Sequence, residues 1–285
     1  MDVHPTQNRQ YCGRIAPTPT GLLHLGHFAT FWTAHQRARQ AGGRLILRTE
    51  DIDPQRCRPE YAEAAIEDLR WAGLDWDEGP DVGGPSAPYE QSQRLDHFRA
   101  SLDALRHKGL VFACRCSRRD LAGAAVAPHD EADEPLYPGT CRDLDIDPAL
   151  EPVCWRFRVP EGEEVSFVDG RLGAQTFTAG KEFGDFVVWR RDDAPSYELA
   201  VVVDDAGMEI TEVVRGEDLL LSTARQLLLY RALRLKAPEF YHCPLVRDEK
   251  GRRLAKRTAG LSLRALREQG VEPSALQNLA LGRKS

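Results

Sequence analysis

Two histidines, His24 and His27, are the first residues along the chain whose type and spacing suggest chemistry. They stand where a helix is expected to begin, and backbone N–H groups at a helix N-terminus favour a phosphate. Imidazoles there can hydrogen-bond phosphate oxygens whose charge rises in a transition state, and Gly26 would let a flat base lie against the backbone. This pattern indicates nucleotide activation. Histidines that merely cap or pack remain an alternative, and a zinc pair is disfavoured because residues 30–40 contain no acid.

A basic cluster near the other end of the chain could bind a pyrophosphate. It reads Arg252-Arg253-Leu254-Ala255-Lys256-Arg257 and lies in a loop that contains Gly and Asp. The alternative is a solvated surface or a loose nucleic-acid contact.

Three cysteines have a spacing that allows a metal site. Cys114 and Cys116 are followed by Cys141, four residues after Tyr137, so three thiols could occupy three corners of a zinc tetrahedron. The alternative is that Cys114 and Cys116 point to opposite faces of a strand and do not bind the same metal ion, and that Cys141 is incidental. Seven cysteines without a secretory signal make a disulfide framework improbable, and the other four are expected to be buried without a role.

Charge is distributed unevenly along the 285 residues, whose formal net charge is −6. Residues 49–90 carry 12 acids and 3 bases, whereas residues 245–285 carry 10 bases and 4 acids. A polyanion could therefore dock on the C-terminal part, although solvated helix faces of opposite sign would give the same counts. No stretch resembles a signal peptide or a membrane span, so we expect a cytoplasmic protein that does not contact membranes.

The elements that must position these residues begin with a strand at 11–15, a rigid turn at 17–21, a helix at 25–41 and a strand at 44–48. This βαβ order predicts an α/β fold with a parallel sheet, in which ligands bind where strands end and helices begin. We expect further helices at 59–73 and 90–108, a mobile Ala-rich loop at 122–132, and a β-rich insertion over 153–203. Helical periodicity returns at 222–235, with Ser222 at the N-cap.

Four ordered blocks resemble the catalytic core of the glutamyl-tRNA synthetases, a class I aminoacyl-tRNA synthetase family. They are residues 14–21, 24–27, 48–53 and 214–218, and the similarity extends over about residues 12–266. The resemblance implies a Rossmann-type parallel sheet with a β-rich, zinc-containing insertion and a short helical C-terminal segment. The expected parts are 1–109 and 196–245 for the catalytic domain, 110–195 for the insertion, and 246–285 for a basic end without an anticodon-binding domain.

The resemblance also implies roles for individual residues in ATP chemistry. Residues 24–27 resemble the family's "HIGH" signature and residues 253–257 its "KMSKS" loop. The implied catalytic residues are His24, His27 and Lys256, and the implied ATP-binding residues are Gly26, His27, Arg253 and Lys256. The loop departs from the family at Ala255 and Arg257, which removes a hydroxyl that could bind phosphate and puts loop closure in doubt.

Glutamate recognition needs cations for two carboxylates and an anion for the ammonium group, and Arg14, Arg215 and Glu50 could supply them. The glutamate-binding residues implied by the resemblance are Arg14, Ile15, Ala16, Pro17, Thr18, Glu50, Tyr197 and Arg215. The alternative for each charged residue is a structural salt bridge. For Arg215 the candidate partners are Glu212, Glu217 and Asp218.

Shortened members of the family carry one structural zinc ion, and the matching residues here are Cys114, Cys116, Tyr137 and Cys141. A phenolate is an unusual ligand, so a water or His129 could replace Tyr137. These members attach glutamate to the base queuosine in the anticodon of tRNA(Asp). The expected partners are thus ATP with Mg²⁺, L-glutamate and tRNA(Asp) carrying queuosine, bound by a monomer. The alternatives are a truncated enzyme charging a tRNA 3′ end and a non-catalytic tRNA-binding relative.

Overall fold

The computed structural model describes residues 10–117, 120, 136–246 and 262–280. The chain forms two compact units. The first unit comprises Met1–Gln93, Gly207–Asp218 and Pro238–Ser285, and the second comprises Arg94–Ala206 and Leu219–Ala237. Among the described helices, none combines the length and apolar character needed to cross a bilayer.

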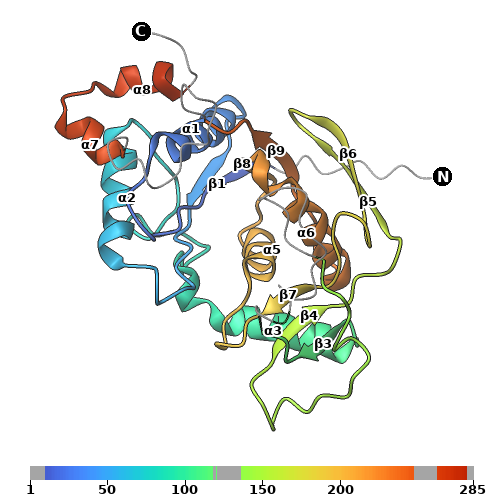
Figure 1. The fold of residues 1–285 in the computed structure, drawn as a ribbon. Coiled ribbons are helices and arrows are strands. Elements are labelled where there is room, and N and C mark those ends of the chain that lie inside the picture. The colour runs from blue at the N-terminus through green and yellow to red at the C-terminus, as the bar shows by residue number, and fades with distance from the viewer. Residues whose placement is uncertain (1–9, 118–119, 121–135, 247–261, 281–285) are drawn as a thin grey trace. The chain divides into compact units, whose positions relative to one another are not determined.

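The first unit opens with the expected βαβ arrangement. Strand β1 (Cys12–Ile15) pairs in parallel with β2 (Arg44–Leu47), and α1 (Leu25–Gln40) connects them, lying beside β1 in Figure 1. The chain re-enters the sheet at Gly43, where an added Cβ would lie 2.4 Å from the Tyr11 carbonyl oxygen. Only glycine permits that approach, so this turn fixes the start of β2.

Two further parallel strands and three helices belong to the first unit. Strand β8 (Glu212–Gly216) pairs with β9 (Glu239–Cys243), and Thr211 next to β8 donates its N–H to the Cys12 carbonyl at 2.8 Å. The helices are α2 (Pro59–Trp71), α7 (Leu263–Glu268) and α8 (Pro273–Ala280). Fully buried side chains from β1, α1, β2 and α2, including Ile15, Phe28, Leu45 and Leu69, form the core of this unit. This burial provides its main stabilisation.

The second unit contains two antiparallel groups of strands and three long helices. Strands β3 (Val111–Cys114), β4 (Cys154–Phe157) and β7 (Phe186–Trp189) form one sheet in the order β3-β4-β7. Strands β5 (Glu164–Asp169) and β6 (Gly173–Thr178) form a hairpin. The helices are α3 (Leu95–His107), α5 (Tyr197–Gly207) and α6 (Leu220–Leu233).

Several expected boundaries differ from the observed ones. Helix α3 begins at Leu95 rather than at 90, because Glu90 bridges Thr49 and Gln91 donates its N–H to the Thr49 carbonyl. The end of the expected β-rich stretch is helix α5. Helix α6 begins before Ser222, with Leu219 as its N-cap.

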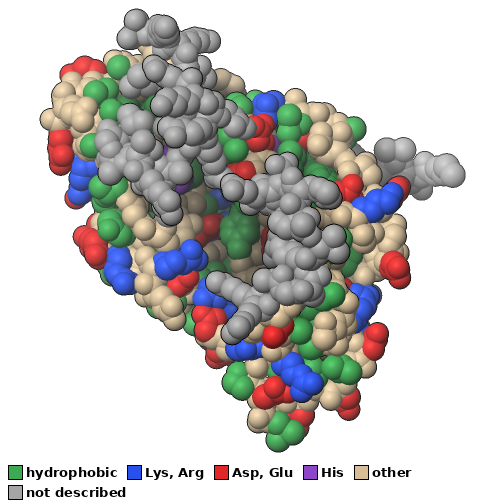
Figure 2. All heavy atoms as spheres, viewed as in Figure 1, with side chains coloured by type: hydrophobic (Ala, Val, Ile, Leu, Met, Phe, Trp, Pro, Cys, Tyr) green, Lys and Arg blue, Asp and Glu red, His purple; other side chains and the backbone are tan. Residues whose placement is uncertain are grey.

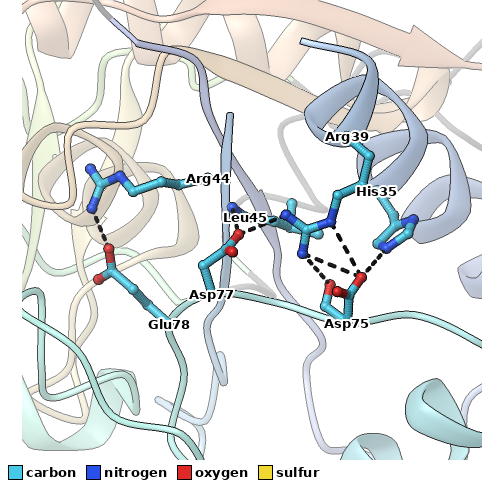
Figure 3. A network of polar contacts seen from close by, with 7 residues as sticks. All are labelled: His35, Arg39, Arg44, Leu45, Asp75, Asp77 and Glu78. Atoms are coloured by element: carbon cyan, nitrogen blue, oxygen red, sulfur yellow. Dashed lines mark hydrogen bonds and ion pairs between the residues drawn. The ribbon is translucent and has the colours of Figure 1, made fainter. Parts of the chain in front are cut away.

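A polar network in the first unit ties α1 and β2 to the segment that follows α2 (Figure 3). His35 Nε2 lies 2.5 Å from Asp75 Oδ1, and Arg39 contacts both Asp75 and Asp77. Asp77 also accepts the N–H of Leu45 at 2.8 Å. The network therefore joins sequence positions 30 to 40 residues apart.

Asp75→Asn tests this network through its pH dependence. The hydrogen bond to His35, followed by the charge of Arg39, lowers the pKa of Asp75. A lowered pKa in the folded state stabilises the fold above the ordinary value, and the contribution is lost as pH falls through the folded value. The Asp75 side chain is 74% exposed, so we expect Asp75→Asn to lower the unfolding free energy at pH 7 by less than about 1 kcal/mol. In urea unfolding, the difference between the two proteins should hold above the ordinary Asp pKa of about 3.9 and shrink only as pH falls below that value, through the lowered pKa of folded Asp75. A difference that does not shrink at more acidic pH would contradict the assignment.

Many of the acidic residues between positions 49 and 90 form ion pairs with arginines. On the face drawn in Figure 2, Lys and Arg side chains lie interspersed with Asp and Glu side chains. The pairs in the first unit include Arg39 with Asp75 and Asp77, Arg44 with Glu78, Arg70 with Asp81, and Arg264 with Glu67. These contacts favour the interpretation of the acidic surplus as solvated, paired helix and loop surfaces.

Candidate active site

His24 and His27 together form the N-terminal cap of α1. The Nδ1 atom of His24 accepts the N–H of Gly26 at 3.1 Å, and the Nδ1 atom of His27 accepts the N–H of His24 at 3.2 Å. These bonds satisfy backbone donors that a helix start leaves without an intrahelical partner. The predicted alternative, capping, is thus a real role of both rings.

The same capping bonds determine which nitrogen of each neutral ring carries hydrogen. Because Nδ1 is the acceptor in both His24 and His27, the proton of the neutral ring lies on Nε2. The two rings stack with centroids 3.7 Å apart and an interplanar angle of 23°. Capping therefore turns each imidazole into an oriented Nε2–H donor, as stabilisation of phosphate charge requires.

Gly26 lies directly against the His24 ring. A Cβ at this position would lie 3.0 Å from Cε1 and 3.1 Å from Nδ1 of His24. Both distances are tight for carbon, so a side chain here would require the His24 ring to shift by a few tenths of an ångström.

Arg14 is anchored from within the parallel strands of the first unit. Its side chain is 5% exposed, and Nη1 donates to the Val214 carbonyl on β8 at 2.9 Å. The strand continues into the predicted glutamate segment. There Ile15 is fully buried, Ala16 and Pro17 are partly or fully covered, and Thr18 is exposed.

Glu50 lies beside this segment and is held by a buried arginine. Its N–H donates to the Pro17 carbonyl at 3.0 Å, which places it next to the end of β1. Arg48 Nη2 lies 3.0 Å from Glu50 Oε1, and the Arg48 side chain is wholly buried. The structural salt bridge considered as an alternative therefore exists, and it fixes the orientation of the carboxylate.

Arg215 on β8 contacts β9 and is 4% exposed. Its Nε donates to His242 Nε2 at 3.2 Å, and its guanidinium lies 5.5 Å from the centroid of the Phe240 ring. Glu212, one of the three acids considered as partners of Arg215, is bound by Arg37 at 2.5 Å. Tyr197 lies in the second unit, where it begins α5 with 39% of its surface exposed.

Sequence reasoning missed His242, which is fully buried and directly opposite Arg215 in the β8–β9 register. By accepting a hydrogen bond at Nε2, the imidazole holds the Arg215 guanidinium in one orientation. The sequence signal for His242 was its alternation with Phe240, which places both side chains on one face of a strand. Without the register of the β8–β9 pair, that signal does not show that His242 lies opposite Arg215.

The basic cluster lies outside the described residues, including Arg253, Ala255, Lys256 and Arg257. The same holds for His129 and the loop expected at 122–132. Ser262, the first described residue after that basic segment, forms an antiparallel bridge with His24. Leu263 donates its N–H to the Leu23 carbonyl at 2.8 Å. The chain that follows the basic cluster is thereby attached to the two-histidine cap.

In the second unit, the structure brings Cys114, Cys116 and Cys141 together with Tyr137. The three sulfur atoms lie within 4.8 Å of one another, and those of Cys116 and Cys141 are 3.5 Å apart. The Tyr137 hydroxyl lies 3.4 Å from Cys114 Sγ and 3.8 Å from Cys116 Sγ. A tetrahedral zinc site with Zn–S bonds of about 2.3 Å has ligand separations of about 3.8 Å. These donors therefore fit a metal, and Cys141 lies in the same cluster as Cys114 and Cys116.

The thiols of this cluster differ in their affinity for protons. Hydrogen bonds with Cys154, Tyr137 and Arg156 lower the pKa of Cys114 to about 4. Burial raises the pKa of Cys116 to about 11, with the Cys141 thiol adding to the shift. A divalent cation would favour the thiolate form of each ligand.

Cys154, to which the sequence assigned no role, belongs to the same apolar cluster. It is the Cα partner of Cys114 in the β3–β4 pair, and its Sγ lies 3.4 Å from the Cys114 carbonyl oxygen. Cys12, Cys57 and Cys243 are buried, as expected.

Comparison with known proteins identifies the family. The model of the tRNA synthetases class I (E and Q), catalytic domain, matches residues 12–283. The chain belongs to this family. The predicted class I synthetase fold, α/β with parallel strands, is confirmed.

Three relatives illustrate the similarity. The chain is 51% identical over 274 residues to the "Glutamyl-Q tRNA(Asp) synthetase" of Symbiobacterium thermophilum, covering 92% of this chain and 83% of that one. It is 49% identical to the protein of the same name from Nitratidesulfovibrio vulgaris, covering 91% and 82%. The crystal structure of a glutamate-tRNA synthetase from Elizabethkingia anophelis superposes with a TM-score of 0.83 at 30% identity. This chain is covered to 95% but spans only 61% of that structure.

Proposed function

We propose that this chain activates L-glutamate with ATP, without requiring tRNA, and transfers the glutamyl group to queuosine in the anticodon of tRNA(Asp). The observation that carries the activation step is the two-histidine cap, in which both Nδ1 atoms accept backbone hydrogens and both rings present Nε2–H. Such donors stabilise charge on phosphate oxygens.

In the first step, a carboxylate oxygen of glutamate forms a bond to the α-phosphorus of ATP, and the bond from that phosphorus to pyrophosphate breaks. Negative charge spreads over the phosphate oxygens, where His24 and His27 donate hydrogen bonds. Lys256 and Arg253 are assigned to the departing pyrophosphate, with Mg²⁺ screening its charge. The bridge between Ser262 and His24 supports this assignment, because position 256 is only six residues before Ser262.

Glutamate would be held by charges at the ends of the parallel strands of the first unit. Arg14 and Arg215 are buried cations suited to carboxylates, and Glu50 is a buried anion suited to the ammonium group. The backbone of residues 15–18 would line the amino acid, and by the family resemblance Arg215 and Tyr197 are assigned to its side-chain end. Arg48 and His242 orient Glu50 and Arg215.

In the second step, a hydroxyl of the queuosine cyclopentenediol attacks the carbonyl carbon of the adenylate and an ester forms. The hydroxyl proton passes to water or to the phosphate of AMP, which leaves with the bonding electron pair. Support for this acceptor comes from the two relatives at 51% and 49% identity, whose name specifies tRNA(Asp). A 3′-terminal acceptor is the second candidate, supported by the structural similarity to a glutamate-tRNA synthetase.

We further propose that Cys114, Cys116, Tyr137 and Cys141 hold one structural zinc ion. The donor set and its spacing support this proposal. The ion would cross-link the segments on either side of residues 117–136 and stabilise the second unit.

Transfer of labelled glutamate identifies the acceptor. We expect labelling of tRNA(Asp) that contains queuosine, and background labelling of tRNA(Asp) without queuosine and of tRNA(Glu). Nuclease fragments should carry the label in the anticodon loop. Transfer to tRNA(Glu) alone, with the label on the 3′ fragment, would establish the second candidate. Glutamate-dependent ATP–pyrophosphate exchange without tRNA tests the activation step separately, and tight tRNA binding without exchange would indicate a non-catalytic relative.

A further inference from the structure

Arg156 on β4 contacts two members of the cysteine–tyrosine cluster. Its side chain is 6% exposed, and its Nε donates to Cys114 Sγ at 3.4 Å. Its guanidinium carbon lies 4.0 Å from the centroid of the Tyr137 ring. A second hydrogen bond, from Nη1 to the Asp185 carbonyl at 3.1 Å, fixes the plane of the group.

The charge of a metal bound here explains why a buried arginine would be useful. Zn²⁺ with three thiolates and a phenolate carries a formal charge of +2 − 4 = −2, and with a neutral phenol −1. A net charge in a buried site is destabilising unless it is paired and hydrogen-bonded. Arg156 supplies one positive charge and an N–H directed at sulfur. Arg191 supplies a second positive charge nearby, donating to the carbonyl oxygens of Arg115 and Cys116 at 2.6 and 3.3 Å.

The contacts of Arg156 differ from those of Arg158, the next arginine along the chain. Arg158, two residues further along, lies over the Phe112 ring at 4.9 Å and pairs with Asp143 at 3.7 Å. It thus shares the arginine–aromatic packing of Arg156, while its ion pair faces an exposed carboxylate. Packing alone therefore does not account for the Nε–H···Sγ contact of Arg156.

We propose that Arg156 is a positioning residue of the metal site, which sets zinc affinity by donating a hydrogen bond to the Cys114 thiolate and by covering the Tyr137 ring with positive charge. Outer partners of metal ligands commonly change affinity 10- to 100-fold when removed. This inference rests on the proposed zinc site and is independent of the proposed tRNA acceptor.

Metal titrations of the full chain test the proposal. Zinc affinity is measured by competition with a chromophoric chelator for the wild type, Arg156→Met, Arg156→Lys and the matched control Arg158→Met. We expect Arg156→Met to weaken zinc binding about 10- to 100-fold and Arg156→Lys to weaken it less, because lysine keeps the charge but loses the planar fork. Arg158→Met should bind like the wild type. With cobalt in place of zinc, the sulfur-to-cobalt charge-transfer band should shift in the Arg156 variants only, since a hydrogen bond to sulfur is lost.

The outcomes are separable. Wild type that binds neither zinc nor cobalt would overturn the metal site and the inference with it. Wild type that binds, together with an Arg156→Met protein of equal affinity and unchanged cobalt spectrum, would overturn the role of Arg156 alone. If Arg156→Met does not fold in the presence of a chelator, Arg156→Lys against Arg158→Lys decides, and equal zinc affinities of those two would overturn the proposal.

Discussion

His27→Asn should lower the rate of glutamate-dependent ATP–pyrophosphate exchange by about 10²- to 10³-fold, with little change in thermal stability. The asparagine Oδ1 can take the place of Nδ1 and accept the His24 N–H, so the helix cap survives. No group replaces the Nε2–H that we assign to the phosphate oxygens. Exchange kinetics and the melting temperature of the same preparation provide the measurement.

His27→Gln is the matched control, because it keeps a donor near the position of Nε2 and loses the helix cap, whereas His27→Asn keeps the cap and loses the donor. Its amide nitrogen can stand near the position of Nε2, while the acceptor for the His24 N–H is lost. We expect it to retain more activity than His27→Asn and to be less stable by about 1 kcal/mol, the usual contribution of an N-cap bond. If activity instead followed stability in both variants, the histidines would have only a structural role.

Arg215→Gln should raise the KM for glutamate by about 30-fold or more, equivalent to at least about 2 kcal/mol for removing a buried charge from a carboxylate. Because we place Arg215 at the side-chain end of the substrate, discrimination between glutamate and glutamine should fall as well. Pyrophosphate exchange with each amino acid gives the ratio of kcat/KM values.

Arg37→Gln is the control for this prediction. Arg37 also binds a strand of the β8–β9 pair, through Glu212, and lies 4.1 Å from the centroid of the Tyr241 ring. We expect its loss to affect stability and to leave the glutamate-to-glutamine ratio unchanged. A ratio that is unchanged in Arg215→Gln would show that Arg215 is a structural residue.

The first βαβ unit was predictable within two residues because its signals are local. An apolar strand, a Pro-rich turn, a periodic helix ended by Gly42 and a second strand each have their own sequence signature. Helix α5 was not predictable in this way. Val201, Val202 and Val203 are β-branched residues that favour strands, yet tertiary burial on most sides makes the segment helical.

The candidate site also contains features that depend on local sequence and features that depend on strand register. The two-histidine cap is local, so its position at a helix start followed from the sequence. The contacts of Arg215 with His242 and of Cys114 with Arg156 join residues 27 and 42 positions apart. Such pairs depend on strand register, and periodicity within one segment does not specify register.

The cysteine–tyrosine cluster also has a consequence for chain entropy. Cys116 and Cys141 are 25 positions apart, so the zinc ion that we propose would close a loop of that length and remove unfolded-state entropy worth about 3 to 4 kcal/mol. This amount varies only logarithmically with loop length, by about 0.6 kcal/mol for each doubling. The number of residues between Cys116 and Tyr137 can therefore drift at little cost to the fold. The four-residue step from Tyr137 to Cys141 is more constrained, because at this spacing the Cys141 N–H donates to the Tyr137 hydroxyl at 2.8 Å.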